Sequence, residues 1–255
     1  MSVRDARPYV SVVIPAYNEE AAIGHVLDDI PREMVDEVIV VDNGSTDRTA
    51  EVALRRSAKL VSEERRGYGQ ACLAGVDALD DSSEIVVFLD ADYSDDPREL
   101  PWLLAPILDD RAELVIGSRT LGHRQRGALA PQARFGNRLA TFLIRRIWGV
   151  AFTDLGPFRA VRRDTLRGLD MRDRNFGWTV EMQVKAAILG VRALEAPVSY
   201  RRRIGKSKIT GTVRGTLGAG VKILATIGYY WVVGVGVAGR HPAASPARHE
   251  REPTA

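Results

Sequence analysis

Three short apolar runs rich in β-branched residues constrain the fold of this 255-residue chain most strongly, because each ends in turn-forming or acidic residues. They are Val10 to Ile14, Glu37 to Val41 and Ile85 to Leu89. Helical periodicity separates them, over Glu19 to Ile30 and Thr46 to Ser57. Strands that alternate with helices are typical of βαβ units and parallel sheets. With a fourth short run at Leu114 to Ile116, the pattern predicts an α/β fold with a mostly parallel, Rossmann-like sheet flanked by helices.

The loops that follow these strands are the candidate site, because ligands of open α/β sheets bind beyond the carboxyl ends of the strands. The loops expected to converge are residues 15–19, 42–47, 90–96 and 117–119. In an extended backbone Asp90 and Asp92 point to the same side, roughly 6 to 7 Å apart. Two carboxylates so placed suit Mg²⁺ or Mn²⁺ bound to a diphosphate. Alone, such a pair more often ends a strand in a solvated turn.

Composition narrows the classes of protein. Apolar residues make up 45% and charged residues 27%, which excludes wholesale disorder and a polytopic membrane protein. Cys72 is the only cysteine, so an intrachain disulfide and a cysteine-based metal site are excluded. Most Lys and Arg residues follow residue 119, yet no zinc-finger, basic-zipper or RNA-binding strand motif accompanies them. We therefore expect phosphate or lipid headgroup partners and no nucleic acid.

In the second half of the chain, a basic region is followed by an apolar segment. Residues 124–146 and 176–189 have helical patterns, and residues 197–200 suggest a short strand before a basic segment at 201–208. Residues 223–238 are almost wholly apolar and lie near the lower length limit for a membrane-spanning helix. They could span, lie on or avoid a membrane. The N-terminal apolar run is too short for a signal peptide, so we expect a cytoplasmic protein peripheral to or anchored in the membrane.

Four motifs carry a resemblance to a known family: VSVVIPAYNE at 10–19, VDNGSTD at 41–47, DADYSDDP at 90–97 and GSR at 117–119. In this order they resemble the family 2 glycosyltransferases, which have a GT-A fold. The chain is most similar to the dolichyl- or polyprenyl-phosphate mannose or glucose synthases, which also have a helix such as 176–186 and a late Gly-x-Ser-Lys, here 205–208. Four ordered motifs together are specific, whereas any single one is weak.

The resemblance implies a metal-dependent, inverting hexosyltransferase. Its donor would be a nucleotide sugar of the GDP-mannose or UDP-glucose type, and its acceptor a polyprenyl phosphate at the cytoplasmic membrane surface. It also implies a GT-A domain over residues 8–212, with a nucleotide-sugar half at 8–120 and an acceptor half at 121–212. An apolar membrane-associating segment at 213–239 and a disordered tail at 240–255 would follow.

The same resemblance assigns residues to the donor. Pro15, Tyr17 and Glu19 would line the nucleotide pocket, Asp42 would bind the base, and Asp90 would contact ribose and metal. Asp92 would be the direct metal ligand, and Ser94 stands where some members have an amide residue, so its hydroxyl or a bound water would complete the metal shell. Gly69 lies at the start of a further helix whose N–H groups could approach the donor, although an ordinary turn glycine would look the same.

Basic residues would gather the phosphate charge, because an acceptor phosphate and a donor diphosphate repel each other. The basic candidates are Arg119, Arg134, Arg202 and Lys208, and the Ser207 hydroxyl is a further candidate for a phosphate contact. Arg suits bidentate phosphate contacts. We assign Arg201 and Arg203 to a solvated basic face. Asp92, Arg119, Glu181 and Lys208 are the predicted catalytic residues.

Two alternatives stay open. A neutral hydroxyl acceptor, soluble rather than lipid-bound, would need a carboxylate base, for which Asp154 or Glu181 is the candidate. Glu181 could equally be structural, because it lies on a helix between apolar residues. The second alternative is a sugar-nucleotide-binding protein that has lost turnover, against which the intact Asp90 and Asp92 pair argues. The sequence leaves the oligomeric state open.

Overall fold

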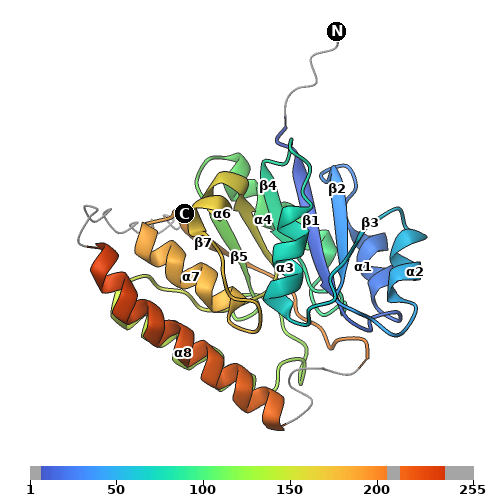
Figure 1. Ribbon diagram of the computed structural model, residues 1–255. Helices are drawn as coiled ribbons and strands as arrows, with labels where there is room; N and C mark the ends of the chain where they lie inside the picture. Colours follow the sequence, from blue (N-terminus) through green and yellow to red (C-terminus); the bar gives the residue numbers. More distant parts are fainter. Residues whose placement is uncertain (1–6, 206–212, 239–255) are drawn as a thin grey trace, which may run out of the picture.

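The structure is a computed structural model that describes residues 7–205 and 213–238 (Figure 1). The predicted disordered tail at 240–255 lies outside the described residues. So do Ser207 and Lys208 of the Gly-x-Ser-Lys segment.

A single sheet forms the centre of the fold. Within the described residues it has seven strands in the order β3-β2-β1-β4-β6-β5-β7. Strand β6 runs antiparallel to β4 and β5, and the other neighbouring strands are parallel. The prediction of a mostly parallel sheet is therefore confirmed. The strands are β1 Val10–Ala16, β2 Glu37–Asp42, β3 Lys59–Ser62, β4 Ile85–Phe88, β5 Leu114–Ser118, β6 Arg159–Arg162 and β7 Ala193–Pro197.

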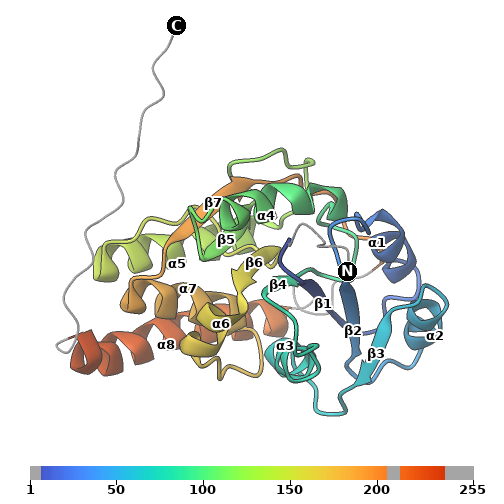
Figure 2. The same ribbon diagram turned by 90° about the horizontal axis from the view of Figure 1, so that it is seen from above.

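Helices cover both faces of the sheet (Figure 2). Helices α1, α2 and α4 pack on one face, and α3, α5, α6, α7 and α8 contribute to the core on the other. They span α1 Ile23–Asp29, α2 Thr49–Leu54, α3 Tyr68–Asp77, α4 Leu100–Leu108, α5 Pro131–Trp148, α6 Arg163–Leu169, α7 Trp178–Leu189 and α8 Val213–Ala238, with a 3₁₀ turn η1 at Pro97–Glu99. The predicted flanking helices are confirmed.

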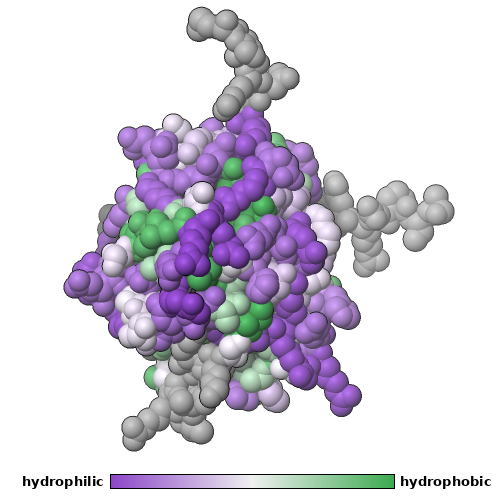
Figure 3. Space-filling model, turned by 90° about the vertical axis from the view of Figure 1, so that its right-hand side faces the viewer, coloured by the Kyte–Doolittle hydropathy of each residue, from purple (hydrophilic) through white to green (hydrophobic). Residues whose placement is uncertain are grey.

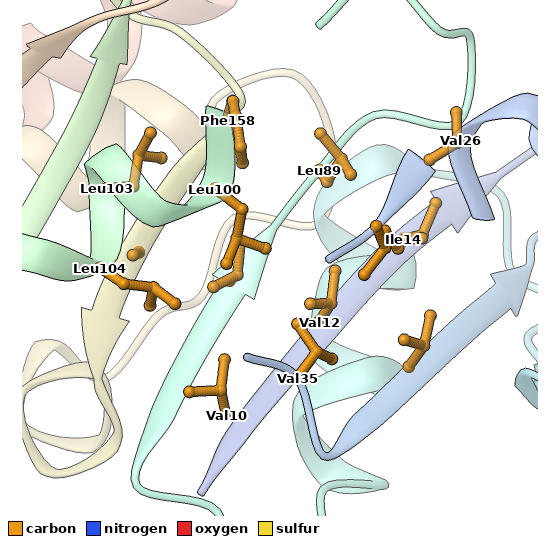
Figure 4. Close-up of a cluster of buried hydrophobic side chains, with 14 of the residues drawn as sticks. Val10, Val12, Ile14, Val26, Val35, Leu89, Leu100, Leu103, Leu104 and Phe158 are labelled. Carbon is orange, nitrogen blue, oxygen red and sulfur yellow. The ribbon is translucent and has the colours of Figure 1, made fainter. Parts of the chain in front are cut away.

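The two cores follow from the alternation of side chains along each strand. In β1, Val12 and Ile14 face α1 and α4 in the first core (Figure 4), whereas Val13 faces the second. In the second core the rings of Phe88 and Trp178 meet edge to face with centroids 5.6 Å apart. Burial on both faces explains why β1, β2 and β4 appear in the sequence as continuous apolar runs.

The sequence did not predict strands β3 and β6, and it misplaced β7. The strand expected at 197–200 lies at Ala193–Pro197, a segment without β-branched residues. In β6, two of four residues are arginines, yet Arg159 is fully buried. Its guanidinium donates to the carbonyl oxygens of Gly156 and Thr179, so backbone acceptors satisfy the buried charge. Local patterns contain no signal for such a partnership.

Helix α8 packs beside α5 and α7 at the β7 end of the molecule (Figure 1). Its outer surface exposes Val221, Tyr229, Trp231 and Val232, while Ile227 is buried. Across residues 7–205 and 213–238, no helix is both long and apolar enough to cross a membrane. The view from the β3 side shows a largely hydrophilic surface with smaller apolar areas (Figure 3).

Candidate active site

A cavity of about 350 Å³ opens beyond the carboxyl ends of β1, β2 and β4. This is where an open α/β sheet places its ligand. Five predicted site residues line it: Pro15, Tyr17, Glu19, Asp90 and Asp92. Its other walls come from Ala16, Asn43, Arg66, Gly67, Tyr68, Ala71, Ala91, Phe176 and Arg203. The strand ends therefore bring together the loops that the sequence predicted to converge.

The loop after β2 supports the cavity from one side. The Asn43 side-chain nitrogen donates to the carbonyl oxygens of Glu63 and Arg65, and its Oδ1 accepts the Gly67 N–H at 2.8 Å. These bonds hold Arg66 over the ring of Tyr17, 3.7 Å from its centroid. A cation and an aromatic ring at the mouth of a cavity suit a nucleotide.

Asp42, the predicted base-binding residue, ends β2 beside this cavity without lining it. Its Oδ1 accepts the N–H of Ser45 at 3.0 Å, which is the turn-forming contact that the sequence also allowed. The structure thus shows the turn role of Asp42, and a contact with a base stays a prediction.

Asp90 and Asp92 form an acidic pair at the floor of the cavity. Asp90 Oδ1 accepts the Tyr68 hydroxyl at 3.0 Å, and Asp92 Oδ2 lies 3.1 Å from Arg203 Nη1. Burial, and next the charge of Asp92, raise the pKa of Asp90 to about 7. Burial and a like charge both disfavour two ionised carboxylates here, so a cation between them would be stabilising.

The chain turns sharply after Asp92, where Tyr93 has a left-handed backbone with φ +62°. This turn lets the Ser94 N–H donate back to Asp92 Oδ1 at 2.9 Å. Ser94 is 1% exposed and does not line the cavity, and its role as a metal ligand stays a prediction. Its backbone N–H orients Asp92.

The start of α3 is closed by another part of the chain. Gly69 and Gln70 donate their N–H groups to the carbonyl oxygens of Asn175 and Arg174. A Cβ on Gly69 would lie 2.0 Å from the Asp173 carbonyl oxygen, so this glycine permits close packing of the loop before α7. The predicted approach of the Gly69 N–H to a donor is therefore wrong, because that hydrogen is already used.

Arg119 is held by Asp154 rather than exposed as an isolated cation. Its N–H and Nε donate to Asp154 Oδ2 at 2.8 and 2.7 Å, and its Nη2 donates to Oδ1 at 2.7 Å. Asp154 is fully buried, and the pKa of its carboxyl group is lowered, with the charge and hydrogen bonds of Arg119 outweighing burial. Asp154 is thus unsuited as a general base, and it positions Arg119.

Glu181, a predicted catalytic residue, has a structural role. Its carboxylate accepts the Asp173 N–H at 2.7 Å and the Tyr230 hydroxyl at 2.7 Å, and it pairs with Lys185 at 2.9 Å. At 1% exposure it does not line the cavity. The catalytic prediction is wrong because these contacts occupy the carboxylate, which joins the loop before α7 to α8.

A second cavity of about 310 Å³ lies at the start of α5. Arg124, Arg134 and Arg138 line it together with Thr120 and Thr153, which adjoin the Arg119–Asp154 pair. Three guanidinium groups around one hollow suit a phosphate. The structure therefore places the predicted phosphate-binding residue Arg134 in a basic cavity.

Arg202 lies on the neighbouring segment, where it donates to the carbonyl oxygen of Arg126 at 3.0 Å. It lines neither cavity, so its predicted phosphate contact stays a prediction. The predicted roles of Ser207 and Lys208 fall outside the described residues.

The donor set fits a hard divalent cation. Asp90 and Asp92 offer carboxylate oxygens, and the described residues contain no cluster of three or more His, Cys, Asp or Glu side chains that could hold a metal. Mg²⁺ and Mn²⁺ sites often use one or two carboxylates and complete the shell with phosphate oxygens and water. A cation at this pair would therefore bind best together with a diphosphate.

Sequence reasoning missed Arg203, Arg66 and Phe176 as cavity residues. Arg203 was assigned to a solvated face, because one arginine in a run of three looks like its neighbours. The adjacent Gly67 was the available sequence signal for Arg66, since a glycine often marks a close approach of two chain segments, and here a Cβ on Gly67 would lie 2.1 Å from the Arg174 carbonyl oxygen.

An α/β fold with an acidic pair at the strand ends and a cavity of this size is typical of enzymes that act on nucleotide substrates. Residues 11–169 match the model of the family "Glycosyl transferase family 2". The chain belongs to glycosyltransferase family 2, as its motifs predicted, and it is an enzyme of the sugar-transferring class.

Two relatives have names that refer to polyprenyl carriers. The chain is 38% identical over 208 residues to a dolichyl-phosphate hexose transferase of Haloferax volcanii, covering 78% of this chain and 86% of that protein. It is 32% identical over 222 residues to an undecaprenyl-phosphate mannosyltransferase of Micrococcus luteus, covering 81% and 89%.

A solved structure supports the GT-A-like fold. Glucosyl-3-phosphoglycerate synthase of Mycobacterium tuberculosis, in complex with Mn²⁺, UDP and phosphoglyceric acid, matches with a TM-score of 0.70 and 26% identity, over 88% of this chain and 78% of that one.

Proposed function

We propose that this chain transfers a hexose from a nucleotide sugar to the phosphate of a polyprenyl phosphate, with inversion and with Mg²⁺ or Mn²⁺ at Asp90 and Asp92. The observation that carries the proposal is the pairing of an acidic, nucleotide-sized cavity with a basic cavity beside Arg119. The acidic cavity suits a cation with a diphosphate, and the basic cavity suits a phosphate. The two relatives named for polyprenyl carriers support the same acceptor class.

In the reaction, a phosphate oxygen of the acceptor attacks the anomeric carbon of the sugar. The bond from that carbon to the donor phosphate breaks, and the nucleoside diphosphate leaves with the electron pair. The cation supplies charge neutralisation for this leaving group. The Tyr68 hydroxyl holds Oδ1 of Asp90 and the Ser94 N–H holds Oδ1 of Asp92, while Oδ2 of Asp92 lies beside Arg203.

The occupied carboxylates favour an anionic nucleophile over a neutral hydroxyl. Asp154 is bound by Arg119 and Leu155, and Glu181 by Lys185, Tyr230 and the loop before α7. Neither can accept a proton from an acceptor hydroxyl without breaking buried contacts. A phosphate oxygen is already negative and needs no base, so positioning and electrostatics can carry catalysis.

The α5 and α8 surface supports a membrane-bound acceptor. Phe135 and Phe142 on α5 are 68% and 60% exposed, and Trp231 and Val232 on α8 are 55% and 75% exposed. The basic cavity lies at the start of the same helix α5. Apolar and aromatic side chains beside arginines suit an interfacial contact with anionic lipid. We propose that this surface lies on the cytoplasmic face of the membrane.

A soluble phosphorylated acceptor is the second candidate, favoured by the likeness to glucosyl-3-phosphoglycerate synthase. The test is to incubate the full chain and Mn²⁺ with GDP- and UDP-sugars, offering polyprenyl phosphate or phosphoglyceric acid in parallel. Product analysis by mass spectrometry should find the hexose in the lipid fraction. Asp92→Asn should abolish that product. Transfer to phosphoglyceric acid with none to lipid would reject the polyprenyl acceptor, and no transfer with any pair would support a binding protein without turnover.

A further inference from the structure

Residues 199–204 form a strap that is pinned to the loop after β4, and Arg203 reaches the acidic cavity from it. The Arg201 N–H donates to the Ser94 carbonyl oxygen at 2.8 Å, and the Ile204 N–H donates to the Asp92 carbonyl oxygen at 3.0 Å. Arg203 lies between these two anchors. Its backbone is therefore fixed next to Asp92, although the two residues are far apart in the sequence.

The Arg203 side chain bridges two acids of the cavity. Its Nη2 lies 2.5 Å from Glu19 Oε1, and its Nη1 lies 3.1 Å from Asp92 Oδ2. Because Asp92 Oδ1 already accepts the Ser94 N–H, Oδ2 is the oxygen that remains for a cation. Arg203 therefore occupies the oxygen that a bound Mg²⁺ or Mn²⁺ would use.

The guanidinium also has an unused donor. Arg203 Nε is buried and has no hydrogen-bond acceptor among the described residues. A buried donor without an acceptor is destabilising. A diphosphate oxygen in the cavity would supply an acceptor, and the planar fork of an arginine matches phosphate geometry.

We propose that Arg203 is a positioning residue that exchanges partners during donor binding. Without ligands it stands in for the cation at Asp92, and when the cation arrives with the nucleotide it moves its guanidinium onto the diphosphate. This inference rests on the proposed function, because it uses the same cation and donor.

The exchange couples the two ligands. A cation alone must displace a positive charge from Asp92 and leaves that charge without a new partner. A cation with a nucleoside diphosphate brings the new partner along. Each ligand therefore raises the affinity for the other, and reciprocal coupling of this kind is typically about 5- to 150-fold.

The test measures Mn²⁺ binding by electron paramagnetic resonance, first alone and then with GDP or UDP, and needs no acceptor or turnover. In Arg203→Gln, Mn²⁺ alone should bind at least about fivefold more tightly, and the nucleotide with Mn²⁺ at least about fivefold more weakly. Arg48→Gln is the charge-matched control, because Arg48 is 75% exposed and pairs with Glu20 outside the cavity. It should match the wild type.

Arg203→Lys tests whether the planar pair of guanidinium donors is needed. A lysine keeps the charge but not the planar pair of donors, so nucleotide affinity should fall between wild type and Arg203→Gln. Unchanged or weaker binding of Mn²⁺ alone in Arg203→Gln overturns the exchange, while the proposed function survives if the wild type binds nucleotide with Mn²⁺. A wild type that binds neither GDP nor UDP with Mn²⁺ overturns both. Thermal unfolding checks that each variant is folded.

Discussion

The Arg119–Asp154 pair should contribute strongly to stability, and Asp154→Asn tests this with an isosteric change. Asp154 Oδ1 accepts from Arg119 Nη2 and Leu155 N, and Oδ2 accepts from Arg119 N and Nε. An asparagine must turn its NH₂ group toward one of these pairs of donors, whichever way it is oriented. The substitution therefore breaks two hydrogen bonds and leaves the guanidinium without a counter-charge.

The exposed fractions of the two side chains set the size of the expected loss in the free energy of unfolding. The Asp154 side chain is 1% exposed and that of Arg119 is 11% exposed, so solvent screens the pair little. Removing one partner of a buried pair costs about 3 to 5 kcal/mol, and the partial exposure of Arg119 favours about 3 kcal/mol here. Urea unfolding followed by tryptophan fluorescence measures the change, since the chain has 4 tryptophans.

Asp109→Asn is the matched control. Asp109 pairs with Arg111 at 3.2 Å, but the two side chains are 60% and 59% exposed. Exposed pairs contribute little, so the urea midpoint should hardly move. If Asp154→Asn lowered the free energy of unfolding by less than about 1 kcal/mol, the pair would behave like a surface pair, and its strong contribution to stability would be refuted.

Three further predictions concern the metal, the loop before α7 and the membrane. Burial raises the pKa of Asp90 to about 7 in the folded chain, above its ordinary value in the unfolded chain. The contribution of this carboxyl to the free energy of unfolding is therefore complete below about pH 4 and is lost as the pH rises through about 7. Because Mn²⁺ must displace the proton, Mn²⁺ affinity should fall about tenfold per unit below pH 7; a flat profile between about pH 5 and 7 contradicts this. Gly69→Ala should lower the melting temperature measured by calorimetry, since its Cβ would meet the Asp173 carbonyl oxygen at 2.0 Å, and an unchanged melting temperature would show that the loop yields freely. Trp231→Ser should weaken co-sedimentation with anionic vesicles, whereas Trp102→Ser on α4, equally 55% exposed, should not; equal losses would reject the α8 surface.

The sequence predicted the parts of the fold that depend on local pattern. Strands β1, β2 and β4 are buried on both faces and therefore appear as uninterrupted apolar runs. The loops after them converge because parallel strands end at one edge of the sheet. This is why Pro15, Tyr17 and Asp92 could be placed in one cavity from the sequence.

The contacts that the sequence did not predict join distant segments. Glu181 looked like a possible base until its partners, Lys185, Tyr230 and the loop before α7, were known. Gly69 looked like a donor-facing glycine, although the opposing Asp173 to Asn175 loop fills that space. Such pairings depend on how helices pack across the sheet, which periodicity does not encode.

The donor cavity also shows how the two halves of the chain depend on each other. The nucleotide-sugar half was expected at residues 8–120, and most of the cavity does lie there. Phe176 and Arg203 come from the second half, and the loop before α7 closes the start of α3. The cavity therefore includes residues from the expected acceptor half. Because Arg203 is on a strap that also contacts the segment after Arg119, one short stretch of chain connects the acceptor region to Asp92.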